Sequence, residues 1–148
     1  MQKVTILCVG KLKEKFYADA VSEYSKRLSR FCKLDIVELN EERLPEDPSP
    51  AQIEAALSRE ADTIRAKLPP AAMAVALCVE GKQRSSEELA RLMADSASRG
   101  VSHLVFLIGG SFGLHPIWPG SCCWSRSTGL TRSTRGQNII NKHLKRTE

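Results

Sequence analysis

Short apolar runs alternate with longer amphipathic segments through most of this chain, and that alternation limits the fold more than any other feature. Four runs have the apolar or alternating pattern of strands: residues 4–9, 33–39, 72–79 and 104–108. The segments between them, which begin near residues 15, 50 and 86, have the apolar spacing of helices. Because this order of strands and helices is typical of parallel sheets, the sequence predicts an α/β domain with a mostly parallel sheet flanked by helices.

Local signals mark the ends of two of the three helices. Ser49–Gln52 and Ser85–Glu88 are capping boxes, and the first also places Pro50 at the first helical position. Pro69-Pro70 and Gly100 mark where these helices end. The earlier helix is predicted by its apolar face alone, which consists of Tyr17, Val21, Tyr24, Leu28 and Phe31.

The charge of the chain is concentrated at one end. Residues 1–115 carry 16 basic and 16 acidic side chains, so the net charge of +5 lies entirely within residues 116–148. No apolar run approaches the length of a membrane span, and the N-terminus does not resemble a signal peptide. We therefore expect a soluble cytoplasmic protein that makes no membrane contact.

The cysteines indicate neither a metal site nor a disulfide framework. Their number is odd and their spacing fits no zinc pattern: Cys8, Cys32, Cys78, Cys122 and Cys123. Two of them lie in apolar runs, where a free thiol behaves as a small hydrophobic side chain. We expect buried free thiols and no metal.

Two of the predicted strands end in features that suit a ligand site. One ends at Leu77, and the other ends at Ile108 and continues into Gly109–Gly113. The carboxyl ends of parallel strands lie at one edge of the sheet, where α/β proteins bind ligands, and glycines let a ligand approach the backbone. A flat ligand with an adenine and a ribose could lie there. The glycine run is not a dinucleotide fingerprint or a Walker A loop, so it also fits a plain tight turn.

Several motifs, in this combination and order, resemble one known family. They are Val9–Lys13, Glu23–Leu28, Glu80–Lys82, Ser85–Leu89 and Ile108–His115. The chain resembles the RlmH-type pseudouridine methyltransferases of the SPOUT, or α/β-knot, superfamily. The resemblance implies a knotted homodimer that uses S-adenosyl-L-methionine to methylate N3 of a pseudouridine in large-subunit ribosomal RNA of the ribosome. It implies cofactor contacts at Leu77 and Gly109, beside which we add Gly110 as a candidate.

The resemblance ends after His115-Pro116. The family continues with a third cofactor segment of the Ser-x-Met-Thr-Leu-Pro-His type, a long helix and a Pro-Tyr-His-Lys ending, and residues 116–148 contain none of these. We therefore divide the chain into a methyltransferase domain, residues 1–115, and an atypical basic tail, residues 116–148. A frameshift or a false gene-model junction is the simplest interpretation, and a genuinely divergent tail is the alternative. The resemblance then predicts an incomplete knot, impaired activity, and a fourth strand that lacks cover and favours partial unfolding or aggregation.

The sequence assigns no catalytic base. His115 follows the glycine run and Glu80 follows a strand, but each fits a structural role as well. Two groups of basic residues could contact RNA phosphates or form ordinary solvated faces: Lys11, Lys13 and Lys15, and Lys26, Arg27, Arg30 and Lys33. Two other functions stay open. One is a non-catalytic RNA-binding or dimerisation module that has lost the cofactor site, and the other is a phosphate- or nucleotide-binding domain built on Gly109–Gly113.

Overall fold

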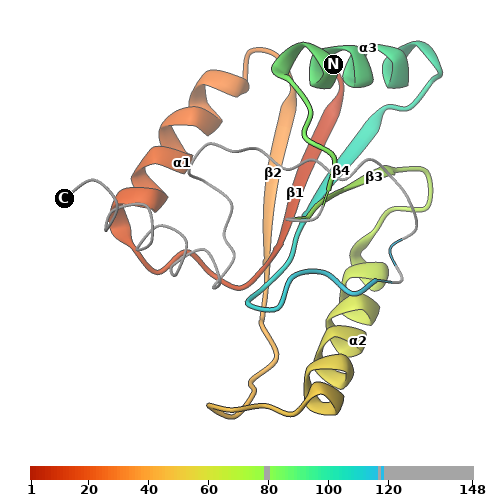
Figure 1. Cartoon of the computed structure of the whole chain (residues 1–148). Coiled ribbons are helices and arrows are strands. Elements are labelled where there is room, and N and C mark those ends of the chain that lie inside the picture. Colours follow the sequence, from red (N-terminus) through yellow and green to blue (C-terminus); the bar gives the residue numbers. More distant parts are fainter. Residues whose placement is uncertain (79–80, 117, 119–148) are drawn as a thin grey trace.

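The computed structural model describes residues 1–78, 81–116 and 118 of the chain. In chain order the elements are β1 (Lys3–Val9), α1 (Lys15–Leu28), β2 (Lys33–Leu39), α2 (Pro50–Lys67), β3 (Met73–Leu77), α3 (Ser86–Ser98) and β4 (His103–Ile108) (Figure 1). The predicted alternation of strands and helices is confirmed, and the strand boundaries differ from the predicted ones by two residues at most. The implied knot involves the part of the chain after residue 115, nearly all of which lies outside the described residues.

The four strands form one sheet in the order β2-β1-β4-β3, and every neighbouring pair is parallel. The chain passes from β1 to β2 at one edge, then crosses to β3 at the other edge and returns to β4 in the middle. The direction of winding therefore reverses between β1 and β4. Such a reversal is where open α/β sheets bind ligands, at the carboxyl ends of the strands.

Each face of the sheet has its own hydrophobic cluster, because successive side chains of a strand point to opposite faces. On one face, the buried residues Leu7, Val105 and Leu107 pack with Ile64 of α2. On the other, a second cluster packs against α3 and consists of Val4, Cys32, Val75, Leu104 and Phe106, with Leu89, Leu92 and Met93 beside it. The expectation that the fourth strand lacks cover is wrong, because β4 lies between β1 and β3 with a cluster on each face.

Both predicted capping boxes are present. In α2, the Ser49 hydroxyl accepts a hydrogen bond from the Gln52 N–H, and Gln52 Oε1 accepts one from the Ser49 N–H. Ser85 and Glu88 make the same reciprocal pair at the start of α3. Gly100 follows the end of α3 with a φ of +82°, a conformation that glycine adopts without the penalty of a side chain. The capping signals in the sequence therefore mark where the two helices that cover the sheet begin.

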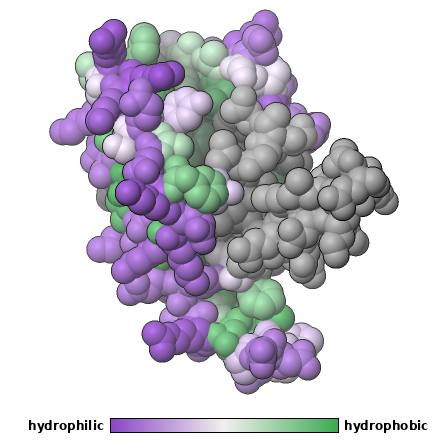
Figure 2. Space-filling model, turned by 90° about the vertical axis from the view of Figure 1, so that its left-hand side faces the viewer, coloured by the Kyte–Doolittle hydropathy of each residue, from purple (hydrophilic) through white to green (hydrophobic). Residues whose placement is uncertain are grey.

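The first helix is different, since none of its residues is buried. Tyr17 and Val21 are half-buried, but Tyr24 and Leu28 are exposed, and so is Phe31 just beyond the helix at 77%. In the view of Figure 2, apolar side chains lie among hydrophilic ones on the face that looks toward the viewer. The predicted apolar face of this helix is therefore largely open to solvent.

Among the described residues, no helix is long and apolar enough to cross a membrane. In the same part of the chain, no group of three or more His, Cys, Asp or Glu residues is placed to hold a metal ion. Of the three described cysteines, Cys32 is buried, whereas Cys8 and Cys78 are half-buried. Cys122 and Cys123 lie outside the described residues.

Candidate functional site

The carboxyl ends of β3 and β4 lie side by side, as the sequence predicts. Leu77 and Ile108 are partners in the parallel register of the two strands, and both are half-buried. Leu77 also packs against the hydrophobic cluster that α3 covers. After β3 the chain turns at once, because the Gly81 N–H donates to the Cys78 carbonyl at 3.3 Å. Glu80, a candidate from the sequence, lies outside the described residues.

Residues Gly109–Gly113, which we call the glycine turn, fold back on themselves directly after β4. The Gly113 N–H donates to the Gly110 carbonyl at 3.1 Å, and Gly113 has a φ of +85°. A Cβ atom on Gly109 would lie 2.3 Å from the backbone carbonyl carbon and oxygen of Gly113, which no relaxed structure permits. Glycine at 109 is therefore required by the turn itself, which is the tight-turn interpretation that the sequence left open beside the approach of a ligand.

Gly110 leaves room for a side chain that sequence reasoning missed. Glu41 Oε1 accepts a hydrogen bond of 2.5 Å from the Ser111 N–H. A Cβ atom on Gly110 would lie 2.8 Å from that carboxylate oxygen and 3.2 Å from Val9 Cγ1. No local pattern indicates this contact, because Glu41 and Ser111 are 70 residues apart in the chain.

The loop that carries Glu41 is tied to α2 by two neighbouring contacts. The Glu42 N–H donates to Glu60 Oε1 at 2.9 Å, and the Glu42 carboxylate pairs with Arg59 at 3.0 Å. Glu60 is buried, at 9% exposed. Burial raises the pKa of Glu60, the Glu42 N–H opposes this, and the charges of Glu41 and Glu42 add to the rise.

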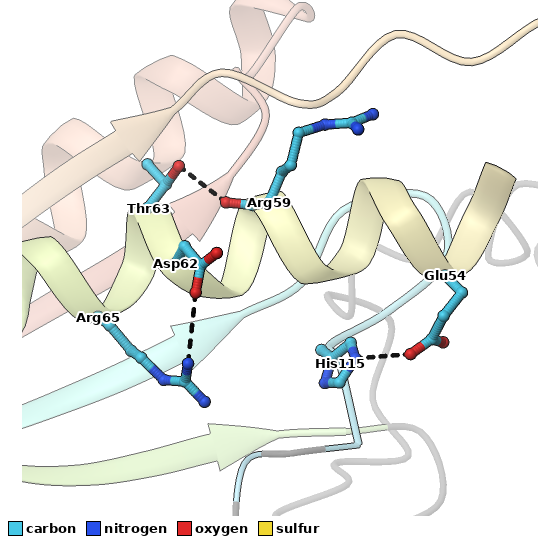
Figure 3. Close-up of polar contacts among 6 residues, drawn as sticks. All are labelled: Glu54, Arg59, Asp62, Thr63, Arg65 and His115. Carbon is cyan, nitrogen blue, oxygen red and sulfur yellow. Dashed lines mark hydrogen bonds and ion pairs between the residues drawn. The ribbon is translucent and has the colours of Figure 1, made fainter. Parts of the chain in front are cut away.

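His115 lies against α2 as well. Its Nε2 is 2.8 Å from Glu54 Oε1, and the His115 side chain is only 14% exposed (Figure 3). Figure 3 shows Glu54 reaching from the first turns of α2 toward the segment that follows the glycine turn. This contact fits the structural role that the sequence analysis left open for His115, namely to anchor the chain after the turn.

The two basic groups of the sequence analysis lie at opposite ends of the sheet. Lys11, Lys13 and Lys15 follow β1 and are exposed near the carboxyl end, and the Leu12 N–H between them donates to Glu38 Oε1 at 3.1 Å. The second group surrounds the end of α1 and the start of β2, at the amino end. In that group Arg27 pairs with Glu23 at 3.0 Å, as ordinary solvated helix residues do.

The geometry agrees with a comparison of the sequence with protein families. The family model described as "Predicted SPOUT methyltransferase" matches residues 2–125 of the chain. This chain belongs to the SPOUT methyltransferase family. The matched region of this SPOUT methyltransferase contains every described element and the whole glycine turn.

Individual relatives carry one shared name, "Ribosomal RNA large subunit methyltransferase H". The protein of Streptococcus equi subsp. zooepidemicus (strain MGCS10565) is 45% identical over 112 residues, which cover 76% of this chain and 70% of the relative. That of Ligilactobacillus salivarius (strain UCC118) is 46% identical over 113 residues, or 76% and 71% of the two chains. That of Streptococcus pyogenes serotype M12 (strain MGAS2096) is 44% identical over 115 residues, or 78% and 72%.

Proposed function

We propose that this SPOUT methyltransferase uses S-adenosyl-L-methionine to methylate N3 of a pseudouridine in large-subunit ribosomal RNA. The family supports the methyl transfer, and the names of the relatives support the RNA substrate. The observation that carries the proposal is the position of Leu77 and Ile108 beside the glycine turn, at the carboxyl ends of β3 and β4, where β4 is one of the two strands between which the winding of the sheet reverses.

The described residues suit the adenosine part of this cofactor. Leu77 and Ile108 are half-buried apolar side chains that a flat base can cover. Gly109 and Gly110 provide backbone N–H and C=O groups of the kind that fix the orientation of a ligand in an apolar pocket. This combination of an apolar surface with a few backbone polar groups is what an uncharged nucleoside requires.

The chain's own contribution to the reaction is to bind and orient its substrates. When bound against Leu77, Gly109 and Gly110, the cofactor would supply an electrophilic methyl group for N3. Leu77 and the glycine turn hold one reactant in place. Holding both reactants in a reactive geometry is worth up to about 7–11 kcal/mol of the barrier. We assign no side chain as the base.

RNA would approach the same end of the sheet. Lys11 and Lys13 are exposed on the loop after β1, and Lys15 is exposed at the first position of α1, near the end of the sheet that carries the glycine turn. Lysine side chains bind nucleic acid through phosphates, and such contacts weaken as the salt concentration rises. We propose that this group contacts the ribosomal RNA, and not the group around the end of α1.

We also propose that the cytoplasmic enzyme is a homodimer whose second copy covers the apolar face of α1. On this face Tyr24 is 61% exposed and Leu28 is 41% exposed, and Phe31 just beyond the helix is 77% exposed, an arrangement that suits a protein partner. Light scattering should give twice the chain mass of 16.4 kDa. Leu28→Asp should yield monomers, whereas Ser22→Asp, at an exposed position of the same helix, should not. A wild-type monomer at all concentrations would overturn this assignment.

The division into residues 1–115 and 116–148 also remains our proposal. It rests on the motifs that are absent from residues 116–148, although the family match continues to residue 125. Resequencing the gene and reading its other two frames after the codon for His115 tests it. A Thr-Leu-Pro-His-like segment in another frame supports a frameshift, and an intact frame without one supports a divergent tail.

Methyl transfer itself is tested with radiolabelled S-adenosyl-L-methionine and large ribosomal subunits that lack the modification, with small subunits as the control. We expect label only in the large-subunit RNA, and nucleoside mass spectrometry should locate it at N3 of a pseudouridine. Failure to bind the cofactor, together with retained RNA binding, would instead favour the non-catalytic module. Preferential binding of ATP would favour the nucleotide-binding domain.

A further inference from the structure

One carboxylate reaches the glycine turn from a distant part of the chain. Glu41 follows β2, and its side chain crosses the end of β1 near Val9 to accept the Ser111 N–H beyond β4. This contact therefore links the loops that follow an edge strand and a central strand. A hydrogen bond from an N–H to a charged carboxylate is stronger than one between neutral groups.

Glu41 is itself held in position. The next residue, Glu42, is fixed to α2 through its backbone by Glu60 and through its side chain by Arg59. These contacts fix the backbone beside Glu41, so its carboxylate is presented to the glycine turn from a supported loop.

The glycine turn needs such support because its own residues restrict it little. Gly109, Gly110 and Gly113 lack side chains, and glycine populates more backbone conformations than any other residue. A turn that must present its backbone groups to a ligand in one geometry gains affinity when that geometry exists before binding. The Gly110 position is shaped for this contact, since a Cβ there would meet the Glu41 carboxylate at 2.8 Å.

We propose that Glu41 is a positioning residue for the cofactor, which acts through the Ser111 backbone to hold the glycine turn ready for binding. This inference rests on the proposed function, because it takes the turn as the cofactor's contact. It also explains why an acidic side chain lies against a turn that is otherwise built of glycines.

The test compares three substitutions at position 41 with one control in the same loop. Glu41→Leu removes the acceptor, Glu41→Asp shortens the side chain by one methylene, and Glu41→Gln keeps an oxygen that accepts the Ser111 N–H. Glu46→Leu removes another exposed acidic residue of the loop as the control. Calorimetry gives the Kd for S-adenosyl-L-methionine, and steady-state kinetics on large subunits give KM and kcat separately.

We expect Glu41→Leu to raise the Kd and the KM for the cofactor by about tenfold, with kcat changed by less than about twofold. Glu41→Asp should also raise the Kd and the KM for the cofactor, whereas Glu41→Gln and Glu46→Leu should keep both values close to those of the wild type. An unchanged Kd in Glu41→Leu would overturn the inference, and so would equal losses in Glu41→Leu and Glu41→Gln. If the wild-type chain does not bind the cofactor, the proposed function fails first and this inference fails with it.

Discussion

Backbone hydrogen bonds join neighbouring segments at both ends of the sheet, including one from the Gly10 N–H to the Leu39 carbonyl at the carboxyl end, but at the carboxyl end glutamate side chains also hold the loops that leave the strands. The Lys3 N–H donates to the Ser102 carbonyl at 2.8 Å, and the Lys33 N–H donates to the Gln2 carbonyl at 3.1 Å. These bonds continue the pattern of the parallel ladders.

At the carboxyl end, besides the capping contact of Glu88, three carboxylates accept backbone N–H groups from irregular segments. Glu38 accepts from Leu12, Glu41 from Ser111 and Glu60 from Glu42. A backbone ladder does not depend on which side chains are present, but these contacts do. The end of the sheet that we assign to binding is therefore the end where one substitution has the largest consequence.

The largest effect is expected at Gly109. Gly109→Ala would place a methyl group 2.3 Å from the Gly113 backbone, so it should lower the free energy of unfolding by about 3 kcal/mol and abolish cofactor binding. Gly100→Ala is the matched control, because its Cβ would meet nothing within 4 Å and only its φ of +82° is unfavourable. That change should cost about 1 kcal/mol and leave binding intact. Urea denaturation and calorimetry measure both, and a Gly109→Ala protein no less stable than Gly100→Ala would contradict the account.

A smaller effect is expected at Glu60. Glu60→Ala leaves the Glu42 N–H without its acceptor and should cost about 1–3 kcal/mol at neutral pH. Glu60→Gln keeps an acceptor and carries no charge to bury, so it should match or exceed the stability of the wild type at neutral pH.

The same pair gives a pH test. The pKa of Glu60 is raised because the folded protein disfavours its charged form. The cost of burying this charge is therefore absent from the free energy of unfolding below pH 4.5. It grows as the pH rises toward the pKa in the folded protein and is complete above that pKa. The advantage of Glu60→Gln over wild type should therefore grow from pH 4.5 upward in denaturant titrations. An advantage that is the same at every pH would contradict the assignment.

The smallest effect is expected at the amino end, at His103. Burial lowers the pKa of His103, the charge of Lys3 adds to this, and Asp35 opposes it. Because the folded protein favours the neutral ring, this group contributes its full share of the free energy of unfolding above pH 6.5. That contribution is lost as the pH falls through the lowered pKa. His103→Gln, which keeps a polar group for Thr5, should lessen this loss on the acid side and leave cofactor affinity unchanged. A changed cofactor affinity in His103→Gln would contradict the proposal that only the carboxyl end of the sheet takes part in binding.

Local patterns were sufficient to predict most of the fold. The capping boxes at Ser49 and Ser85 form because their partners lie three residues away, and the strands follow from short apolar runs. The adjacency of Leu77 and Ile108 followed from the general geometry of parallel sheets. These features depend on interactions that are close in the chain or common to a fold class.

The remaining features depend on distant contacts that no periodicity encodes. Glu41 and Ser111 meet only because the sheet brings β2 and β4 to either side of β1. The clash that requires glycine at 109 comes from the way the turn folds back, which a run of glycines does not specify. The exposure of Leu28 could not be predicted either, because an amphipathic pattern does not say what covers the apolar face.

An amide NMR titration of the wild-type chain with S-adenosyl-L-methionine will show whether the cofactor binds at the carboxyl end of β3 and β4. We expect shifts for the amides of Leu77, Gly109, Gly110 and Gly113, while those of Thr5 and His103 at the other end of the sheet stay unchanged. No shifts at saturating cofactor, or shifts confined to the amino end, would contradict binding at the carboxyl end.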